Sequence, residues 1–377
     1  MARRQCPENS YPQPLLAVAG YKLPGATRAF PDAPLSDQSW SEILRLALAH
    51  RMTGLLCAAI DAGAFPATEV QMHQIRTAHT SAMVWVLLLE RKLFPVIDLL
   101  TEANIETRVL KGAAVAHLDY SAPELRSFID LDLLIRAEDF DHAVRVLAAA
   151  GFVRRLPEPR PGFDRRFDKG TTFEGPGGYE LDLHRTFVLG PWGLLVDLEG
   201  LWGDGQEVMI AGRTLCALSR GHRFLHACYH AALGDWPLRL GSLRDVAEML
   251  RGAEGFATEL RELASCWRVE AVVAAAVADT WRLLGLATTT ELSSWAQRYV
   301  PSRQDEARLA LHTQADKTFT AQALATLHAM PRVRDKVAYA RALILPDARY
   351  VAGRHPSALA RFRYGLREAR RGRGNSQ

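Results

Sequence analysis

The chain has 377 residues, of which 48% are hydrophobic and 23% are charged, and its formal net charge is +4. This length suits two or three domains, and the composition is that of an ordinary globular protein, which excludes wholesale disorder and a coiled-coil rod. The small net charge does not indicate a nucleic-acid-binding field over the whole protein. No apolar run reaches the roughly 18 residues needed to cross a bilayer, and the N-terminus lacks the apolar core of a signal peptide. The five cysteines are scattered without a CxxC pair, so we expect a cytoplasmic protein with no membrane span.

The first part of the chain is predicted to be helical after an irregular start. Residues 1–37 are rich in Pro, Gly and Ala and show no sustained periodicity, which predicts an irregular arm. Apolar residues recur at helical spacing from Ser39 onward, and Ser39 with Glu42 matches a capping box. A second long helix is expected over about 67–103, with Pro95 kinking or breaking it.

The central part changes to a mixed pattern of strands and helices. This order predicts a small α/β or α+β domain of about 100 residues. The expected elements are a strand at 107–110, a helix at 113–118, a strand at 127–135, a helix at 138–150, a polar strand at 163–174, a turn at 175–178 and a strand at 179–185.

After about Thr214 the pattern is helical to the end of the chain. The whole chain therefore divides into residues 1–104 (irregular arm plus helices), 105–214 (the α+β domain) and 215–377 (a helical domain with a basic tail). The tail between Arg361 and Arg373 is favoured as a solvated terminus, with RNA contact as the less favoured alternative. The expected C-terminal helices cover 220–233, 240–251, 256–286, 305–327 and 332–345.

Acidic residues stand out in two of the predicted strands. Because side chains alternate along a strand, Asp130 and Asp132 share one face, and Asp182 shares a face with Glu180 and His184. Asp is disfavoured in strands, and neighbouring strands would bring three aspartates together, where they repel unless a cation lies between them. Oxygen ligands without thiols favour Mg²⁺ or Mn²⁺. Because the aspartates repel one another, replacing Asp130 or Asp132 with alanine should leave the metal-free fold at least as stable. The alternative, which we favour less, is that Asp130 and Asp132 form the polar edge of a half-exposed strand.

Lys111 and Gly112 lie where the first predicted strand turns into a helix. Glycine allows the backbone to approach a ligand closely, and the N-terminus of the following helix favours an anion. Lys111 adds a positive charge, so the turn is a candidate phosphate cradle. An ordinary surface turn is the alternative.

Two charged residues outside these motifs have open alternatives. Arg126 precedes the aspartate-bearing strand and either binds phosphate or pairs with Glu124 or a site aspartate. Asp245 either faces a cleft and contacts a base or ribose, or pairs with a neighbouring arginine of its own helix.

Three histidines also have open alternatives. His184 hydrogen-bonds a ligand or a carboxylate, or else has a structural role, which is slightly favoured. His226 and His230 lie one helical turn apart with Cys228 between them. Without a second ligand pair, helix packing is favoured over zinc binding.

The order of these motifs resembles the nucleotidyltransferase superfamily and, more narrowly, a family described as uncharacterised nucleotidyltransferases. The resemblance is carried by L-K-G-A-A, R-S-F-I-D-L-D-L-L-I and E-L-D-L-H, covers roughly 108–185, and continues weakly through 226–230 and 243–245. It implies a small mixed sheet with flanking helices. It also implies that Asp130, Asp132 and Asp182 are catalytic and bind Mg²⁺ or Mn²⁺. The candidate nucleotide-binding residues beside them are Lys111, Gly112, Arg126, His184 and Asp245.

The activity implied by the resemblance is transfer of a nucleoside monophosphate from an NTP to a hydroxyl, with release of pyrophosphate. The acceptor is a small molecule, a peptide or protein, or an RNA end. The superfamily turn usually carries a Ser whose hydroxyl contacts the triphosphate, whereas this turn reads Lys111-Gly112-Ala113, so a lysine charge would replace that contact. A catalytically silent module that binds a nucleotide or partner is the alternative, and the three aspartates favour the enzyme. We expect residues 215–345 to form the far wall of the aspartate cleft and to set the acceptor pocket.

Overall fold

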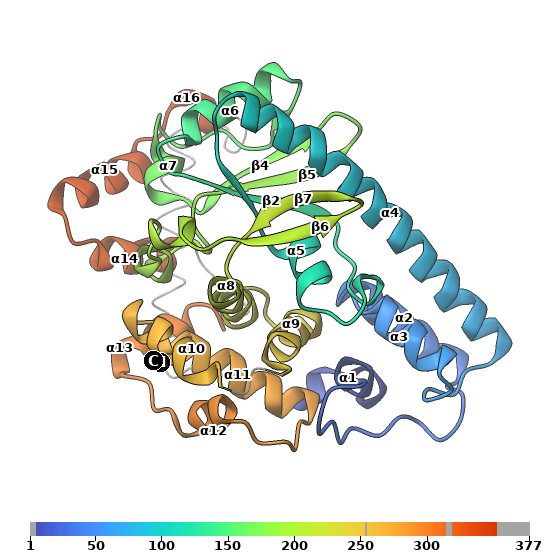
Figure 1. The fold of residues 1–377 in the computed structure, drawn as a ribbon. Coiled ribbons are helices and arrows are strands. Elements are labelled where there is room, and N and C mark those ends of the chain that lie inside the picture. The colour runs from blue at the N-terminus through green and yellow to red at the C-terminus, as the bar shows by residue number, and fades with distance from the viewer. Residues whose placement is uncertain (1–4, 253–254, 314–318, 353–377) are drawn as a thin grey trace.

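The computed structural model describes residues 5–252, 255–313 and 319–352, so the arginine-rich tail lies outside the described residues. The predicted α+β class is confirmed, because one seven-stranded mixed sheet lies among helices contributed by both ends of the chain (Figure 1). The strand order is β3-β4-β5-β2-β1-β7-β6. The strands are β1 (Thr107–Val109), β2 (Asp130–Ile135), β3 (Val153–Arg154), β4 (Gly170–Gly175), β5 (Tyr179–His184), β6 (Gln206–Ile210) and β7 (Arg213–Ala217).

The pairing of β2 with β5 sets the geometry of the sheet centre. These two strands run parallel, and β1 and β7 also pair in parallel, whereas the other neighbours are antiparallel. The predicted turn between β4 and β5 is confirmed, since Gly178 N donates to Gly175 O over 3.0 Å. The predicted hairpin therefore places β4 beside β5 on the side away from β2.

Two parts of the sheet differ from the sequence prediction. The hairpin of β6 and β7 was missed, although Val208, Ile210 and Leu215 are buried in a period-two pattern. Each strand has only five residues, which is too short to stand out from the helical pattern that follows. Residues 163–174 are also not one strand, because Phe163 and Phe167 lie one helical turn apart in α7 (Phe163–Phe167) and contact the ring of Tyr339.

The N-terminal segment is more ordered than predicted. The expected irregular arm is wrong for α1 (Gln13–Gly20), whose residues 15–20 are buried. The predicted capping box at Ser39 is also wrong, because α2 (Asp37–Ala49) begins earlier and the hydroxyl of Ser36 accepts from Ser39 N. A further helix, α3 (Thr53–Asp61), follows.

The long helix α4 (Glu69–Glu102) continues through Pro95, so the predicted break does not occur. Its N-terminus is fixed by a capping box between Thr68 and Gln71. Pro95 lies on the exposed side of the helix, where water can satisfy the carbonyl that proline leaves free. The opposite side, including Leu93 and Val96, packs against the sheet.

The remaining helices cover the sheet and build the lower part of the molecule in Figure 1. The predicted run 256–286 is two helices separated at residues 267–269, where Arg268 has a φ of 57°. Among the described residues, no helix combines the length and the apolarity that crossing a membrane requires. The helices are α5 (Lys111–Leu118), α6 (Phe140–Ala149), α8 (Arg220–Leu233), α9 (Leu240–Leu250), α10 (Ala257–Cys266), α11 (Glu270–Leu284), α12 (Glu291–Arg298), α13 (Arg303–Ala310), α14 (Phe319–Ala329), α15 (Val333–Ile344) and α16 (Ala348–Ala352).

Two large apolar cores hold these elements together. One lies between the sheet, α4, α5 and α6. The other joins α1, α2 and α3 with α8, α9 and α11, so residues from both ends of the chain share it. Buried Arg244 links the two ends directly, since its Nη1 donates to Ala19 O and Tyr21 O over 2.9 and 2.7 Å. The division of the chain at residues 104 and 214 stays a prediction.

Candidate active site

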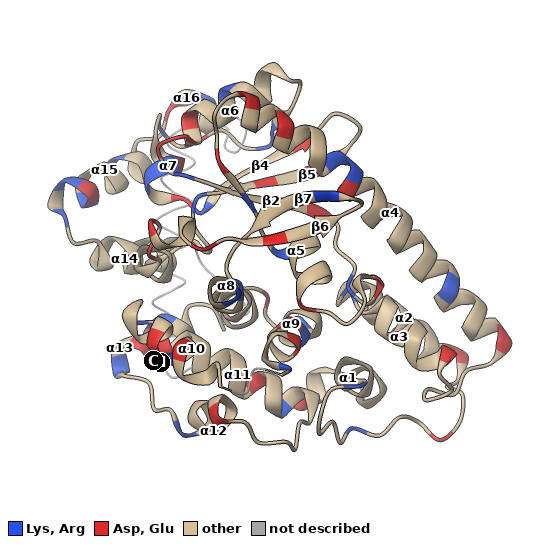
Figure 2. Cartoon of the chain, viewed as in Figure 1, with Lys and Arg blue, Asp and Glu red and all other residues tan. Residues whose placement is uncertain are grey.

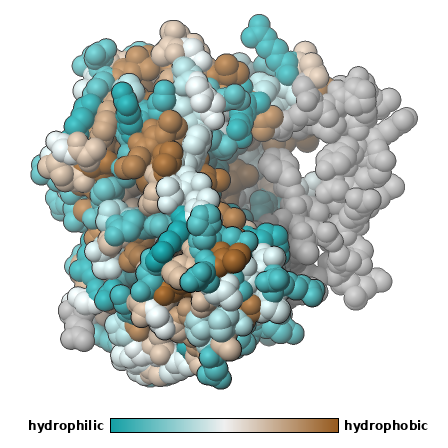
Figure 3. Space-filling model, turned by 90° about the vertical axis from the view of Figure 1, so that its right-hand side faces the viewer, coloured by the Kyte–Doolittle hydropathy of each residue, from teal (hydrophilic) through white to brown (hydrophobic). Residues whose placement is uncertain are grey.

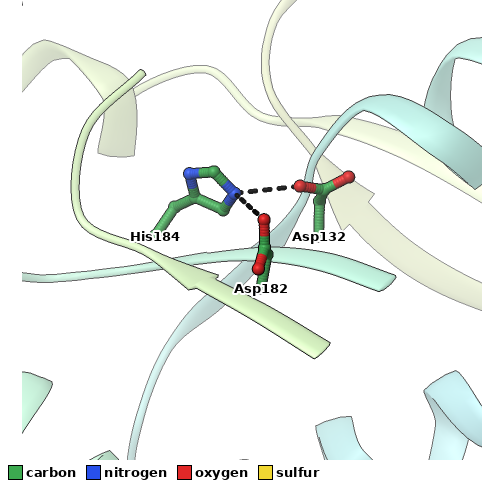
Figure 4. Close-up of side chains that lie close together, drawn as sticks. All are labelled: Asp132, Asp182 and His184. Atoms are coloured by element: carbon green, nitrogen blue, oxygen red, sulfur yellow. Dashed lines mark hydrogen bonds and ion pairs between the residues drawn. The ribbon is translucent and has the colours of Figure 1, made fainter. Parts of the chain in front are cut away.

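Asp132 and Asp182 lie side by side at the centre of the sheet. They are direct register partners on the parallel strands β2 and β5, as the sequence predicts if these strands are neighbours. His184 lies two residues beyond Asp182, on the same face of β5. Ligand atoms of these three residues all lie within 4.8 Å of one another, and Figure 4 shows the His184 ring directed at both carboxylates.

Asp132 is a buried, ionised carboxylate. Its Oδ1 lies 2.7 Å from Lys111 Nζ and accepts a 2.9 Å hydrogen bond from His184 Nε2. Burial by itself raises the pKa of a carboxyl, but the Lys111 charge and the His184 hydrogen bond outweigh it and hold the pKa of Asp132 well below its usual range. Burial lowers the pKa of His184, so its ring is neutral at neutral pH. The other ring nitrogen, Nδ1, lies away from the carboxylates in Figure 4 and has no hydrogen-bond partner among the described residues.

Asp182 is held by groups from the neighbouring strand β4. The hydroxyl of Thr172, its register partner, donates to Asp182 Oδ1. Lys169 Nζ lies 3.6 Å from the other carboxylate oxygen. The side chain is 14% exposed, so this carboxylate is the more accessible of the two.

Asp130 lies apart from this pair. It shares the face of Asp132 at the start of β2, but its carboxylate is paired with Arg51 at 3.4 Å and does not belong to the cluster of Asp132, Asp182 and His184. Arg51 lies between α2 and α3 with a left-handed φ of 60°. The register partner of Asp130, Glu180, is paired with Arg155 at 2.7 Å.

Sequence reasoning missed Arg51, Lys169 and Thr172. Arg51 comes from a segment about 80 positions before the aspartates in the chain, where nothing in the sequence signals a role. Thr172 could have been found from the turn at 175–178, because the hairpin register places it opposite Asp182.

The donor set fits a divalent cation with oxygen ligands. Asp132 and Asp182 present carboxylate oxygens to one another with one imidazole beside them, and no thiol lies in the cluster. Lys111 and His184 both contact Oδ1 of Asp132, and the described residues form no hydrogen bond to its Oδ2. Each aspartate of the site also has a basic neighbour, which balances its charge within the chain. The pairs are Asp130 with Arg51, Asp132 with Lys111, and Asp182 with Lys169.

The turn at Lys111 and Gly112 has the glycine-dependent geometry that the sequence suggests. Both residues have a φ of 22°, in the left-handed region, and a Cβ on Gly112 would come within 3.3 Å of the Phe128 ring. Gly112 lies inside the bounds of α5 but has a non-helical backbone, so the regular part of the helix, with its N-terminal amides, follows the turn. Lys111 points to Asp132, which places the turn and the carboxylates in one site.

Arg126 and Asp245 are paired with each other. Arg126 donates from Nε and Nη2 to the two oxygens of Asp245 over 2.8 and 2.7 Å, and Tyr120 OH donates to the same carboxylate over 2.8 Å. Arg126 Nη1 also donates to Gly112 O over 3.1 Å. The pair therefore ties the candidate phosphate turn to α9. Arg126 is not paired with Glu124, and Asp245 is not paired with an arginine of its own helix.

Helix α8 lies on the aspartate side of the sheet, as expected, but it packs directly on the Lys111 turn. The cavity between Lys111, His226, His230 and Asp245 is only about 10 Å³. A cavity of about 470 Å³ beside Asp182 is lined by residues between 154 and 184 and by Tyr350, and by none of the described residues between 215 and 345. Within the described part of the chain, the larger cavity therefore lacks the far wall that we expected from residues 215–345, and only the small cavity lies between the Lys111 turn and α8.

The helix-packing interpretation of His226 and His230 agrees with the structure. His226 stacks on Phe187 with ring centroids 4.4 Å apart, and His230 Nδ1 lies 3.1 Å from Ser242 Oγ. Burial, reinforced by the Lys111 charge, lowers the pKa of both rings, that of His230 to about 4. Neither belongs to a potential metal cluster within the described residues.

The buried histidines His50, His226 and His230 make the free energy of unfolding depend on pH. Burial lowers the pKa of His50 to about 4, and its Nδ1 accepts from Leu240 N over 3.2 Å. Between the usual pKa of 6.5 and the lowered value, the unfolded chain binds protons that the folded chain does not, so the free energy of unfolding falls as pH falls through this range. Thermal melts at about pH 7 and about pH 5 should show a drop in Tm, and His230→Asn should make it smaller. His73→Asn, at an exposed position of α4, is the control. A drop in Tm between these two pH values that is as large in His230→Asn as in the unaltered protein would contradict the expectation.

Comparisons with known proteins place the chain among nucleotidyltransferases. Three solved structures are similar over part of the fold: ANT(2'')-Ia in complex with adenylyl-2''-tobramycin (17% identity, 48% of this chain and 97% of that chain, TM-score 0.36), the lincosamide antibiotic adenylyltransferase LnuA with lincomycin bound (16%, 42% and 94%, 0.30), and an antigenic nucleotidyltransferase-like protein from Paracoccidioides brasiliensis (16%, 50% and 92%, 0.27). No curated protein matches the chain. The model of a family described as uncharacterised nucleotidyltransferase matches residues 36–285.

Proposed function

This chain belongs to the family of uncharacterised nucleotidyltransferases, and on that basis we propose that it transfers a nucleoside monophosphate from an NTP to a hydroxyl group. The observation that carries the proposal is the pair Asp132 and Asp182, placed opposite one another on parallel strands beside the Lys111 turn. A divalent cation, Mg²⁺ or Mn²⁺, held by Asp132 and Asp182, would offset phosphate charge and activate the attacking oxygen. Asp130, on the same face of β2, would join the metal ligands by leaving its pair with Arg51.

The protein residues have distinct roles in this proposal. The acceptor oxygen forms a bond to the α-phosphorus, the bond between that phosphorus and the pyrophosphate oxygen breaks, and the hydroxyl proton passes to Asp182. Lys111 and the amides at the start of α5 bind the triphosphate. Arg126 and Asp245 hold the turn in place through Gly112 O.

One observation favours the second candidate, a catalytically silent binding module. Arg51, Lys111 and Lys169 already balance the charge of the three aspartates, so the chain can keep these residues together without a cation. In an active enzyme Lys111 would move from carboxylate to phosphate when the NTP arrives.

The test is incubation with each α-labelled NTP and Mg²⁺ or Mn²⁺. Metal-dependent label on protein, RNA or extract metabolites, accompanied by pyrophosphate release, supports the enzyme. NTP binding without transfer to any of these, with or without metal, supports the silent module.

Replacing Lys111 with alanine should weaken binding of an NTP by about tenfold or more, since a charged hydrogen bond is lost. The corresponding NMP should lose less, because Lys111 acts on the β- and γ-phosphates. Equilibrium dialysis with both nucleotides measures the difference, and Lys336→Ala on α15 is the matched control. Equal losses for NTP and NMP would instead identify Lys111 as a structural residue of the Asp132 pair.

A further inference from the structure

The cavity of about 470 Å³ beside Asp182 has no role in nucleotide binding as described so far. Resting on the proposed function, we infer that it is the acceptor site and that the acceptor is a small, non-anionic molecule with an apolar part, rather than RNA or a protein.

The cavity reaches the carboxylate that would take the hydroxyl proton. Asp182 lines it together with Thr172 and His184, whereas Lys111, Asp130 and Asp132 do not. The triphosphate turn and the cavity thus lie on different sides of the carboxylate pair, as a donor and an acceptor must. His184, which is 1% exposed, also lines the cavity. Its buried Nδ1 lacks a partner within the described part of the chain, so this nitrogen can accept a hydrogen bond from a hydroxyl or amine of the ligand.

The size and the walls suit an amphipathic small molecule. A volume of about 470 Å³ lies within the range of small-molecule sites. The sheet side of the cavity is polar, whereas Leu156, Pro157 and Phe163 give it an apolar side. A ligand with a hydroxyl at one end and an apolar body at the other fits both sides.

The charges disfavour a polyanion. Arg155 and Lys169 face Glu180 and Asp182, at 2.7 and 3.6 Å, and Arg154 is ion-paired with Asp164. Asp168 also lines the cavity, and no ion pair to its side chain occurs within the described residues. RNA binding requires basic groups that are free to face phosphates, and here each lining base already has a carboxylate. Figure 2 likewise shows blue and red residues interspersed in that view rather than gathered into a basic face.

The test fills the cavity without disturbing the core. Leu156 lines the cavity and is 51% exposed, so Leu156→Trp narrows the site from a position that tolerates a larger side chain. Val153, which is 66% exposed on neighbouring β3 and does not line the cavity, gives the matched control Val153→Trp. Each protein is assayed for binding of a labelled NTP with Mg²⁺, and for transfer of label to the small-molecule, RNA and protein fractions of a cell extract.

We expect label in the small-molecule fraction, reduced about tenfold or more by Leu156→Trp because the acceptor is misplaced. NTP binding by this variant and transfer by Val153→Trp should match the unaltered protein. Label only in the RNA or protein fraction, or undiminished transfer by Leu156→Trp, overturns the acceptor assignment while leaving the proposed function standing. Failure of the unaltered protein to bind any NTP overturns the proposed function and this inference with it.

Discussion

Asp132→Asn should lower nucleotidyl transfer by at least about 1,000-fold while leaving the protein folded. Asparagine keeps the size and one oxygen of the side chain but removes the charge that a divalent cation needs. The measurement is the single-turnover rate of label transfer, with circular dichroism to confirm the fold. Asp204→Asn, at an exposed acid before β6, is the control. Turnover near the unaltered level in Asp132→Asn would remove the metal-binding assignment.

Asp132→Ala should destabilise the metal-free protein, which is the opposite of what the sequence predicts. Repulsion between aspartates predicts that removing one leaves the metal-free fold at least as stable. Instead, Asp132 is the buried partner of Lys111 and His184, so Asp132→Ala leaves both without their carboxylate and should destabilise the fold. Asp130→Ala should change stability little, since its pair with Arg51 is partly exposed and 3.4 Å long.

Arg126→Ala should lower the free energy of unfolding by about 3–5 kcal/mol, the typical cost of leaving a buried charge unpaired. The side chains of Arg126 and Asp245 are 12% and 13% exposed, and Gly112 O would lose its donor as well. Urea unfolding measures the loss. Asp245→Ala should cost a similar amount, and the double variant should cost less than the two single losses together.

The control is another ion pair at the start of α9. Arg239 and Asp235 lie 2.8 Å apart but are 26% and 48% exposed, so Arg239→Ala should cost under about 1 kcal/mol. An Arg126→Ala loss as small as that of Arg239→Ala would show that the buried pair does not hold the turn.

The part of the site that follows strand periodicity could be predicted from the sequence. Alternation along two strands was enough to place Asp132 and Asp182 on matching faces, and their register then brought them together. The partners of these carboxylates could not be predicted in the same way. Arg51 and Asp130 are 79 positions apart, and Arg126 and Asp245 are 119 apart, so only the folded chain brings each pair together.

The fold shows the same limit. Helices with a long apolar stripe, such as α8, were predicted with their observed bounds. α1 is apolar on nearly every side and only eight residues long, so it has no amphipathic pattern to detect. Its helical state depends on packing against α9 and α11, which follow much later in the chain.

Several apolar side chains of α4 are exposed rather than packed against the sheet. Figure 3 looks onto the side of the molecule where this helix lies, and brown apolar residues are scattered there among teal ones. Val84 and Leu87 of α4 are 62% and 64% exposed. Only part of this helix therefore serves the sheet core.

The burial of α1 has a consequence for how the chain is made. Ala19 accepts its hydrogen bond from Arg244, 225 positions later, so the pocket for α1 does not exist while the sheet is being synthesised. A nascent chain leaving the ribosome carries Leu15, Leu16 and Val18 without their partners until α9 and α11 have emerged. The sheet can form early from its own segment, whereas α1 finds its partners only after α9 and α11 have been made, and contacts so far apart in the chain slow folding.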